Sequence, residues 1–344
     1  MKQSILVGIS ALLMALFLPM CLLSPVEAEA VEPGFLIIEN PQPKGTVQIE
    51  PEPVAEAVPY DGTVEIRLQT GNGVESLSLD EYLTGVVLAE MPASFALEAL
   101  KAQAVAARTF TLRQMEAGKH TDCDVCSDSG CCQAWIDQAT LKAKLGDAWS
   151  GYWEKAAKAV AETDGVVLTY DGALIDAVYF SCSGGTTEPA AAVWGSEIPY
   201  LQPVDSPGEE TAPRYESQVS VSMDRFRSLI LQQNAEADLS GPAAGWFGGV
   251  TYSAGGGVET MEIGGQTFRG TALRSLFGLN STLFTVAVEQ DAVVFEVHGF
   301  GHRAGMSQYG ANAMAQSGST YDEILLHYYT GVTLEQAPSL VSPP

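Results

Sequence analysis

The stretch that decides the fold is DEYLTGVVLAEMPASFALEALKAQAVAARTFTLRQM, residues Asp80 to Met115. It contains two helical patterns, and Met91-Pro92 separates them. Proline lacks a backbone N–H and disfavours helical backbone in the residue before it, so the first helix is predicted to end near Glu90. The second helix is predicted to begin after the proline, with Ser94 as its N-cap, and to end at Gly118.

Glu90 is therefore predicted to lie at a helix end, where unpaired carbonyl groups carry partial negative charge. Its neighbours Leu88, Met91 and Phe95 are apolar. Both features oppose ionisation of a carboxyl group, and a carboxyl group that stays neutral near pH 7 can act as a general acid. Glu90 is our candidate catalytic residue. The alternative is an ordinary solvated glutamate, which is the commoner case at helix ends.

The second helical pattern is rich in alanine, which lets neighbouring elements approach closely and predicts a buried central helix. Tight-turn pairs between apolar runs predict antiparallel hairpins elsewhere. These turns are Asp171-Gly172 within residues 166–180, Gly264-Gly265 and Gln290-Asp291. Because strands and helices mix without a regular βαβ alternation, we predict an α+β fold with one or two subdomains around the alanine-rich helix.

Other segments have patterns of their own. Residues 63–68 alternate as a strand does, and Gly71 to Gly73 is expected to turn the chain toward the first helix. The glycine-rich residues Ser240 to Gly257 are expected to form a surface loop. Further helices are predicted at 153–162, 223–232, 271–277, 306–316 and 321–329.

The composition limits the class of protein. The 344 residues carry 17 basic and 42 acidic side chains, a net charge of −25, which argues against nucleic acid as the main partner. Residues 1–30 contain an apolar run behind Lys2 and are predicted to be a signal peptide or a membrane anchor, so we expect the protein to act outside the cytosol. Residues 31–60 are predicted to form an acidic Pro/Glu-rich linker. Residues 61–335 are predicted to form a folded domain, and residues 336–344 are predicted to be a tail.

The densest cluster of metal-type ligands is HTDCDVCSDSGCCQAW, residues 120–135. His120, Cys126 and Cys132 are evenly spaced in it, and Cys123 and Cys131 add two further thiols. Zinc takes a tetrahedral set of nitrogen and sulfur ligands. Disulfides are the alternative, because an exported protein meets an oxidising environment.

Two more segments carry polar groups suited to a binding site. YFSCSGGTT, residues 179–187, combines hydroxyl groups with glycines that let a ligand approach the backbone, although an ordinary turn has the same composition. Cys182 in it would be a nucleophile if a histidine lay beside it. GFGHRAGMSQYGANAMAQSG, residues 299–318, places His302 among glycines and offers Gln308 and Tyr309 as sugar contacts, unless they only lock the helix.

Taken together, these segments resemble the stage II sporulation protein D family, which also contains a wall-amidase enhancer. The resemblance runs from about Thr63 to Val332 and depends on five ordered motifs. These are LDEYLTGVVLAEMPASFALEALKAQAVAARTFTL, HTDCDVCSDSGCCQAW, YFSCSGGTTEPAAAVWG, GFGHRAGMSQYGANAMA and YDEILLHYYTGV. Arg303 stands where the family loop usually has glycine.

The resemblance implies a lytic transglycosylase that cleaves peptide-stripped glycan strands of peptidoglycan. Its partners would be an amidase and a membrane scaffold during forespore engulfment. The family's catalytic glutamate falls on Glu90, and its zinc ligands fall on His120, Cys126 and Cys132, where zinc has a structural role. The proposed substrate-binding residues are Tyr179, Ser183, His302, Gln308 and Tyr309.

Two other functions stay open at this point. A peptidase or amidase would use Cys182 with His302 and release peptides instead of glycan fragments. A non-catalytic module would bind the wall or activate an amidase, as one branch of the family does. It would not depend on Glu90.

Overall fold

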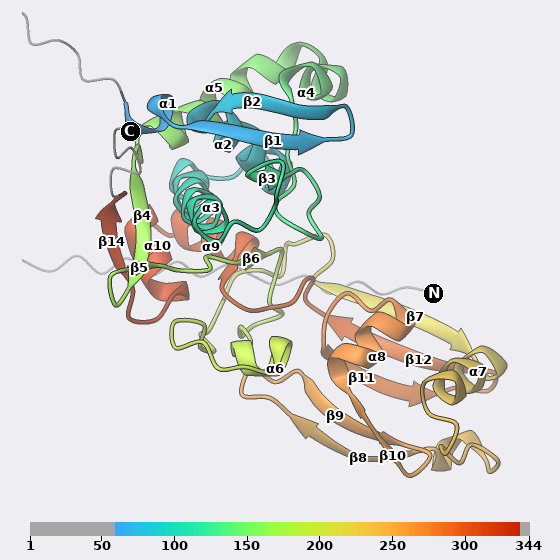
Figure 1. Ribbon diagram of the computed structural model, residues 1–344. Helices are drawn as coiled ribbons and strands as arrows, with labels where there is room; N and C mark the ends of the chain where they lie inside the picture. Colours follow the sequence, from blue (N-terminus) through green and yellow to red (C-terminus); the bar gives the residue numbers. More distant parts are fainter. Residues whose placement is uncertain (1–58, 338–344) are drawn as a thin grey trace, which may run out of the picture. The chain divides into compact units, whose positions relative to one another are not determined.

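The computed structural model describes residues 59–337 (Figure 1). The predicted signal or anchor, most of the predicted linker and the last residues of the predicted tail lie outside this range. No helix within residues 59–337 is both long enough and apolar enough to cross a membrane. The α+β class is confirmed, because helices alternate irregularly with small, mostly antiparallel sheets.

Two sets of elements surround two clusters of buried apolar side chains. The first set is α1 Tyr60–Thr63, β1 Glu65–Thr70, β2 Gly73–Ser78, α2 Leu79–Glu90, α3 Leu97–Ala117, β3 Val125–Cys126, α4 Gln138–Leu145, α5 Trp149–Ala161, β4 Val166–Tyr170, β5 Ala173–Leu174, β6 Tyr179–Phe180, α6 Ala190–Trp194, β13 Met306–Ser307, α9 Gln308–Gln316, α10 Tyr321–Tyr328 and β14 Thr333–Gln336. The second set is β7 Glu216–Ser222, α7 Met223–Gln233, β8 Phe247–Tyr252, β9 Val258–Ile263, β10 Gln266–Arg269, α8 Gly270–Phe277, β11 Leu283–Val288 and β12 Ala292–His298. Short 3-10 turns lie at Gly146–Ala148 and Ala243–Gly245.

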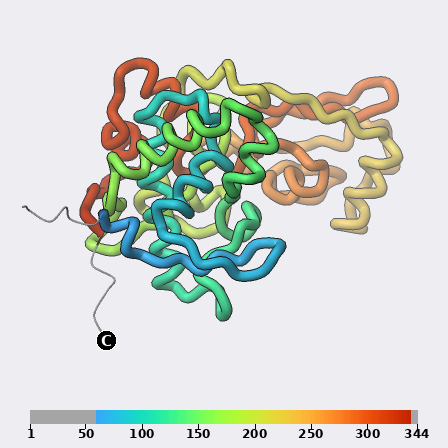
Figure 2. Tube along the Cα trace, turned by 90° about the horizontal axis from the view of Figure 1, so that it is seen from above, coloured from blue at the N-terminus to red at the C-terminus, as the bar shows by residue number. Residues whose placement is uncertain are grey.

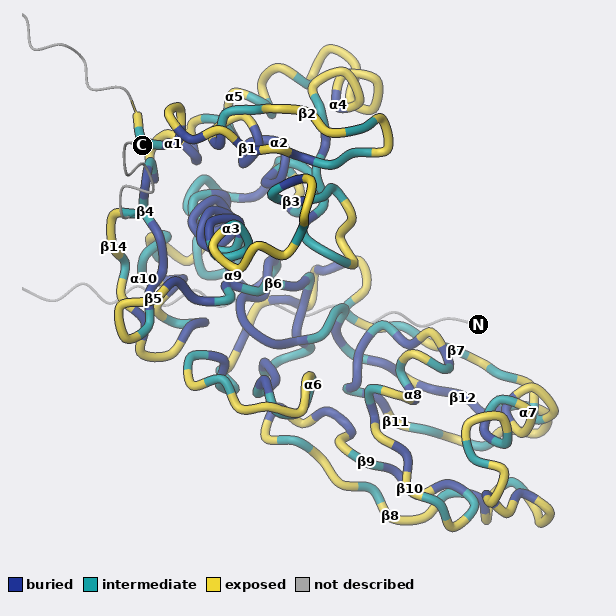
Figure 3. The backbone as a smooth tube through the Cα atoms, viewed as in Figure 1, coloured by how far each residue is buried: buried dark blue, intermediate teal, exposed yellow. Residues whose placement is uncertain are grey.

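Helix α3 is the centre of the first cluster, as the alanine pattern predicts (Figures 2 and 3). It contacts α2, α5, α9, α10 and β4, and its alanines allow these close approaches. Gly118 ends it in the left-handed conformation, as predicted. The predicted N-cap is wrong, because Ala96 takes that position and its N–H donates to Asn312 Oδ1 at 2.9 Å instead. Asn312 on α9 thus pairs the backbone donor of the N-cap residue, and α3 has no side-chain cap.

Helix α2 ends at Glu90, and Met91 is extended, as the proline predicts. The segment before it differs from the prediction. Gly71-Asn72 turns the chain into a second strand, β2, which pairs antiparallel with all six residues of β1 before α2 begins. The alternation in β2 is weak because most of its side chains are partly or fully exposed.

The second cluster joins two three-stranded sheets, β11-β12-β7 and β10-β9-β8. Within it the ring of Phe226 stacks on those of Trp246 and Phe277, and the ring of Phe295 is tilted against that of Phe277. The hairpins at Gly264-Gly265 and Gln290-Asp291 are confirmed. Residues 240–257 are not only a loop, because β8 lies among them and pairs with β9 across a bulge. The glycines there weaken the strand pattern, so this short edge strand could not be recognised from the sequence.

The predicted hairpin at Asp171-Gly172 is confirmed only over β4 and β5. Both turn residues have positive φ, 51° and 75°. The chain then leaves this hairpin, and β6 pairs in parallel with β13, which aligns Tyr179 with Met306. Two motifs more than a hundred residues apart in sequence are thereby placed side by side.

Candidate active site

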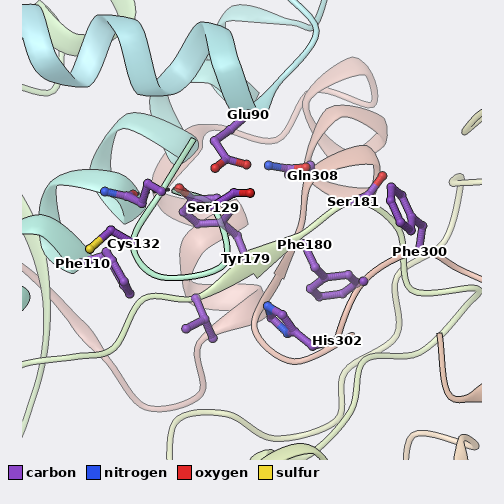
Figure 4. Close-up of a pocket in the computed structure, with 13 residues that line it drawn as sticks. Glu90, Phe110, Ser129, Cys132, Tyr179, Phe180, Ser181, Phe300, His302 and Gln308 are labelled. Carbon is purple, nitrogen blue, oxygen red and sulfur yellow. Dashed lines mark hydrogen bonds between the residues drawn. The ribbon is translucent and has the colours of Figure 1, made fainter. Parts of the chain in front are cut away.

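A cavity of about 470 Å³ lies where the end of α2, β6, the 300–302 loop and the start of α9 meet (Figure 4). Four of the predicted catalytic and substrate-binding residues line it: Glu90, Tyr179, His302 and Gln308. Tyr179 lies on β6, His302 lies in the loop before β13, Gln308 is the first residue of α9 after β13, and α2 supplies Glu90. The fold thus assembles the cavity from four of the five motifs on which the sequence prediction depends.

Glu90 projects into this cavity from the last residue of α2. Its Oε1 accepts a hydrogen bond of 2.7 Å from the backbone N–H of Ala134. Burial raises the pKa of the Glu90 carboxyl, and it outweighs the Ala134 bond and the amide of Gln308, which act in the opposite direction. The carboxyl group is therefore biased toward the neutral form that a general acid needs.

The Gln308 amide nitrogen points toward the Glu90 carboxyl group (Figure 4). Gln308 is the first residue of α9, and Ser307 caps that helix through Gly310 N–H. The Nε2 atom is buried and makes no close hydrogen bond among the described residues, but it lies near enough to the Glu90 carboxyl to lower its pKa. The amide group has two N–H donors, so Gln308 can face Glu90 and still bind a polar group of a ligand.

Tyr179 lines the cavity together with Gln133, a residue that the sequence analysis did not identify. Its hydroxyl donates to Gln133 Oε1 at 2.7 Å, and Gln133 Nε2 donates in turn to Thr111 Oγ1 at 2.9 Å. Burial raises the pKa of Tyr179 well above its usual value, so the phenol stays neutral. Gln133 fixes the direction of the phenol hydroxyl. A polar residue directly after the cysteine pair was its only sequence signal.

His302 is neutral at physiological pH. Burial, together with the charge of Arg274, lowers its pKa to about 4. The ring lies between Phe180 and Trp194, with centroid distances of 5.5 and 5.3 Å. Its Nδ1 accepts a hydrogen bond from the N–H of Ala304, which assigns the ring proton to Nε2. The imidazole can position a ligand through a polar and an aromatic contact, but it carries no charge.

Ser183 and Tyr309 do not line the cavity. Ser183 is fully buried, and its hydroxyl donates to Glu209 Oε2 at 2.7 Å. The Tyr309 ring packs edge-on against Phe95 at a centroid distance of 5.0 Å. The substrate-binding role predicted for these two residues stays a prediction, and their contacts in this structure are internal.

Glu209 is a second residue that sequence reasoning missed. It is 1% exposed, and its carboxylate accepts hydrogen bonds from Ser183 N and Oγ, Gly184 N, Ser206 Oγ and Ser307 Oγ. Gly310 lets this cluster pack closely, because a Cβ there would collide with Ser206. We call Glu209 and these donors the Glu209 hub. The hub joins the segment after β6 to the cap of α9, and each of these segments adjoins residues that line the cavity.

Cys182 and Arg303 are likewise placed away from the cavity lining. Burial raises the pKa of the Cys182 thiol to about 11, and no hydrogen bond joins it to His302 among the described residues. This environment keeps the thiol protonated. Arg303 has φ of 68° and forms a buried ion pair of 2.7 Å with Glu188. The glycine-like backbone of the loop is therefore kept, although the residue is arginine.

The predicted metal ligands His120, Cys126 and Cys132 lie together, and Cys131 joins them. The four ligand atoms all lie within 4.8 Å of one another. All five cysteines in the described range are free thiols, and Cys123 is buried outside the cluster. One imidazole nitrogen and three sulfurs match the ligand preference of zinc and can complete a tetrahedron. Cys132 also lines the cavity, so this candidate metal centre adjoins the candidate active site.

Comparisons with known proteins agree with this arrangement. The family model described as stage II sporulation protein matches residues 69–170, which include Glu90 and the His/Cys cluster. Stage II sporulation protein D of Bacillus subtilis (strain 168) is 36% identical over 307 residues, which cover 88% of this chain and 85% of that protein. The protein of the same description from Bacillus amyloliquefaciens is 36% identical over 95% of this chain and 94% of its own. The amidase enhancer of Bacillus subtilis is 30% identical over 73% of this chain and 40% of its own. Identity at this level over nearly the whole length places the chain in the stage II sporulation protein D family.

Proposed function

We propose that this protein is a lytic transglycosylase that cleaves the bond between N-acetylmuramic acid and N-acetylglucosamine in peptide-stripped glycan strands of peptidoglycan. The observation that carries the proposal is the single carboxyl group of the cavity. Glu90 is the only acid among the described residues that line it, and its environment favours the neutral form. Glycosidases that use water or a covalent intermediate need two carboxyl groups. One carboxyl group fits a reaction in which the sugar supplies its own nucleophile.

In this reaction Glu90 donates its proton to the glycosidic oxygen as the bond from that oxygen to C1 of the muramoyl residue breaks. The Glu90 carboxylate then accepts the proton of the C6 hydroxyl, whose oxygen bonds to C1 and closes the 1,6-anhydro ring. The proton on Glu90 is restored, and no water is consumed. Ala134 N–H supports the carboxylate between the two steps, since it donates to Oε1.

The other cavity residues bind and orient the glycan. Gln308 Nε2 has a free donor beside Glu90, which suits a sugar hydroxyl or amide oxygen. Tyr179 is held neutral against Gln133, and His302 presents its neutral imidazole from an aromatic setting. Aromatic faces also pack well against sugar rings. These residues exclude water and position C6 near C1, which is the geometric requirement of the reaction.

We further propose that His120, Cys126, Cys131 and Cys132 hold a zinc ion. Four protein ligands leave no open position, so zinc would supply a structural cross-link rather than catalysis. The cross-link would fix the loop that carries Gln133 and Ala134, and these residues contact Tyr179 and Glu90.

The biological setting is part of the proposal, and the likeness to stage II sporulation proteins supports a role in sporulation. We propose that the protein acts during sporulation, at forespore engulfment, outside the cytosol and attached to the membrane. An amidase would remove the stem peptides first, and a membrane scaffold would hold the two enzymes together. The net charge of −25 gives no attraction to an anionic wall, so recognition depends on local contacts.

The test is digestion of amidase-treated peptidoglycan followed by mass spectrometry of the products. Wild type should release fragments that end in 1,6-anhydro-muramic acid, and Glu90→Gln should reduce the rate about 10²–10⁴-fold. Glu81→Gln is the matched control, because Glu81 is an exposed acid on the same helix. Reducing ends without anhydro sugar would indicate a hydrolase. Full activity of Glu90→Gln would remove Glu90 from the mechanism.

A second candidate function follows from the likeness to the amidase enhancer, which covers 73% of this chain. A non-catalytic activator would bind glycan without cleaving it and would accelerate a purified sporulation amidase. Glu90→Gln would then leave that acceleration unchanged. The two functions are separated by one measurement of anhydro sugar in the absence of amidase.

A further inference from the structure

Arginines that have no acidic partner lie beside two of the residues that line the cavity, although no arginine lines it directly. Phe300 lines the cavity, and the guanidinium carbon of Arg214 lies 4.7 Å from the centre of its ring. His302 is the next lining side chain, and the charge of Arg274 lies close enough to lower its pKa. The Nε of Arg274 donates to the carbonyl oxygen of Leu279 at 3.4 Å, which leaves its two terminal nitrogens available.

A third arginine lies near Trp194, which does not line the cavity but packs on the lining residue His302. Trp194 is 46% exposed and packs on His302 at a centroid distance of 5.3 Å. At Gly195, the next residue, the position of a Cβ atom lies 3.8 Å from Nη1 of Arg269. We name Arg214, Arg269 and Arg274 the arginine rim.

The rim arginines have no acidic partner although the chain has a net charge of −25. Among the described residues, no carboxylate oxygen lies within 4.0 Å of a nitrogen of any rim arginine. Arg108 and Arg303 show the contrary arrangement, because each is buried against an acid. Acids outnumber bases more than two to one here, so guanidinium groups beside the cavity that have no acidic partner are free to bind an external anion.

We propose that the arginine rim binds the free carboxylate of muramic acid residues in the glycan. This inference rests on the proposed function. Removal of a stem peptide converts the amide on the lactyl group of muramic acid into a carboxylate on the sugar itself. A guanidinium group pairs with a carboxylate through two parallel hydrogen bonds, whereas an amide offers one neutral acceptor. The rim thereby distinguishes peptide-stripped strands from intact strands in a protein that has no general attraction for anions.

The experiment measures binding apart from cleavage. Glu90→Gln protein is titrated with peptide-free glycan oligosaccharides and with the same oligosaccharides after methyl esterification of their carboxyl groups. We expect the ester to bind about tenfold more weakly, and we expect higher salt to weaken only the carboxylate form. Adding Arg214→Gln should weaken carboxylate binding about five- to tenfold and leave ester binding unchanged. Arg225→Gln is the control, because Arg225 is an exposed arginine on α7.

Each outcome bears on the proposal. Equal binding of ester and carboxylate, equal effects of the Arg214 and Arg225 substitutions, or no binding of either glycan would overturn it. Equal binding of glycan that retains its stem peptides would also overturn it, since peptide carboxylates would then be the ligand. If wild type formed no anhydro sugar, the transglycosylase assignment would be refuted. The binding titrations would still test the arginine rim, because they do not depend on cleavage. In wild-type background, Arg214→Gln should raise KM and leave kcat unchanged if cleavage occurs.

Discussion

Glu209→Ala is the substitution that tests most directly how this site is held together. The Glu209 carboxylate is the only acceptor that the structure gives to the backbone N–H groups of Ser183 and Gly184, at 2.9 and 3.0 Å. Its other oxygen accepts from the hydroxyls of Ser206 and Ser307. The hydroxyls can rotate toward other acceptors, but the two backbone donors cannot.

The expected loss of stability follows from those two donors. A buried donor left without a partner costs about 1–3 kcal/mol, so two of them cost about 2–6 kcal/mol. A water molecule in the vacated space would bring the loss toward the lower end of that range. Glu209→Gln should cost much less, because its carbonyl oxygen can keep both backbone hydrogen bonds while its NH₂ group faces the two hydroxyls.

The assay is urea denaturation, with the midpoint and slope compared across a set of variants. Glu210→Ala is the matched control, because Glu210 is the adjacent exposed acid. The order of stability should be wild type and Glu210→Ala together, then Glu209→Gln, then Glu209→Ala. If Glu209→Ala lies within about 0.5 kcal/mol of the control, or if Gln is as damaging as Ala, the hydrogen-bond reasoning is refuted.

Three further predictions concern charge and metal. Burial raises the pKa of Glu90 in the folded state, so the stability that its protonated form contributes is present below the unfolded pKa and is lost as pH rises through the folded pKa. Activity should fall over the same pH range. In calorimetry, Glu90→Gln should melt at a higher temperature than wild type at pH 7 but not at pH 3. Cys131→Ser should release zinc to a chelator faster than wild type does, whereas Cys123→Ser should match wild type in a colorimetric zinc assay. Arg108→Met should cost about 3–5 kcal/mol in urea denaturation because it leaves Asp61 buried without its partner, and a loss under about 1 kcal/mol would contradict this.

Local signals in the sequence were enough to predict part of the fold. The end of α2 follows from one proline, and the end of α3 follows from Gly118. The turns at Asp171-Gly172 and Gly264-Gly265 follow from residues that accept positive φ. In each case the residues that decide the structure are neighbours in the chain, so the physical cause can be read from a short window.

Pairing between distant segments could not be read in this way. The strands β6 and β13 have two residues each, which is too short for an alternation pattern. Their parallel pairing depends on the packing of α9 and on the Glu209 hub, and neither has a local signature. The N-cap of α3 was missed for the same reason, because Ala96 takes that position and its N–H is paired by Asn312 from the distant helix α9.

The residues of the candidate site fall into the same two groups, those with a local sequence signal and those whose role depends on distant contacts. Glu90 could be predicted because a helix end and its apolar neighbours are local features, and the motifs contain Tyr179, His302 and Gln308. Gln133 could not be assigned a role, because its importance comes from contacts with Tyr179 and Thr111.

Arg303 shows how the region around the second apolar cluster contributes to a cavity that it does not line. Left-handed backbone at a residue other than glycine costs about 1–2 kcal/mol, and Arg303 adopts it with φ of 68°. Its guanidinium group offsets that cost through buried hydrogen bonds to Glu188, to the carbonyl of Ser183 and to the carbonyl of Gly255, which precedes β9. These bonds tie the residue after His302 to both apolar clusters. The buried Arg303 therefore positions the imidazole of His302. A glycine at position 303 would leave the loop free to move, whereas the arginine fixes it.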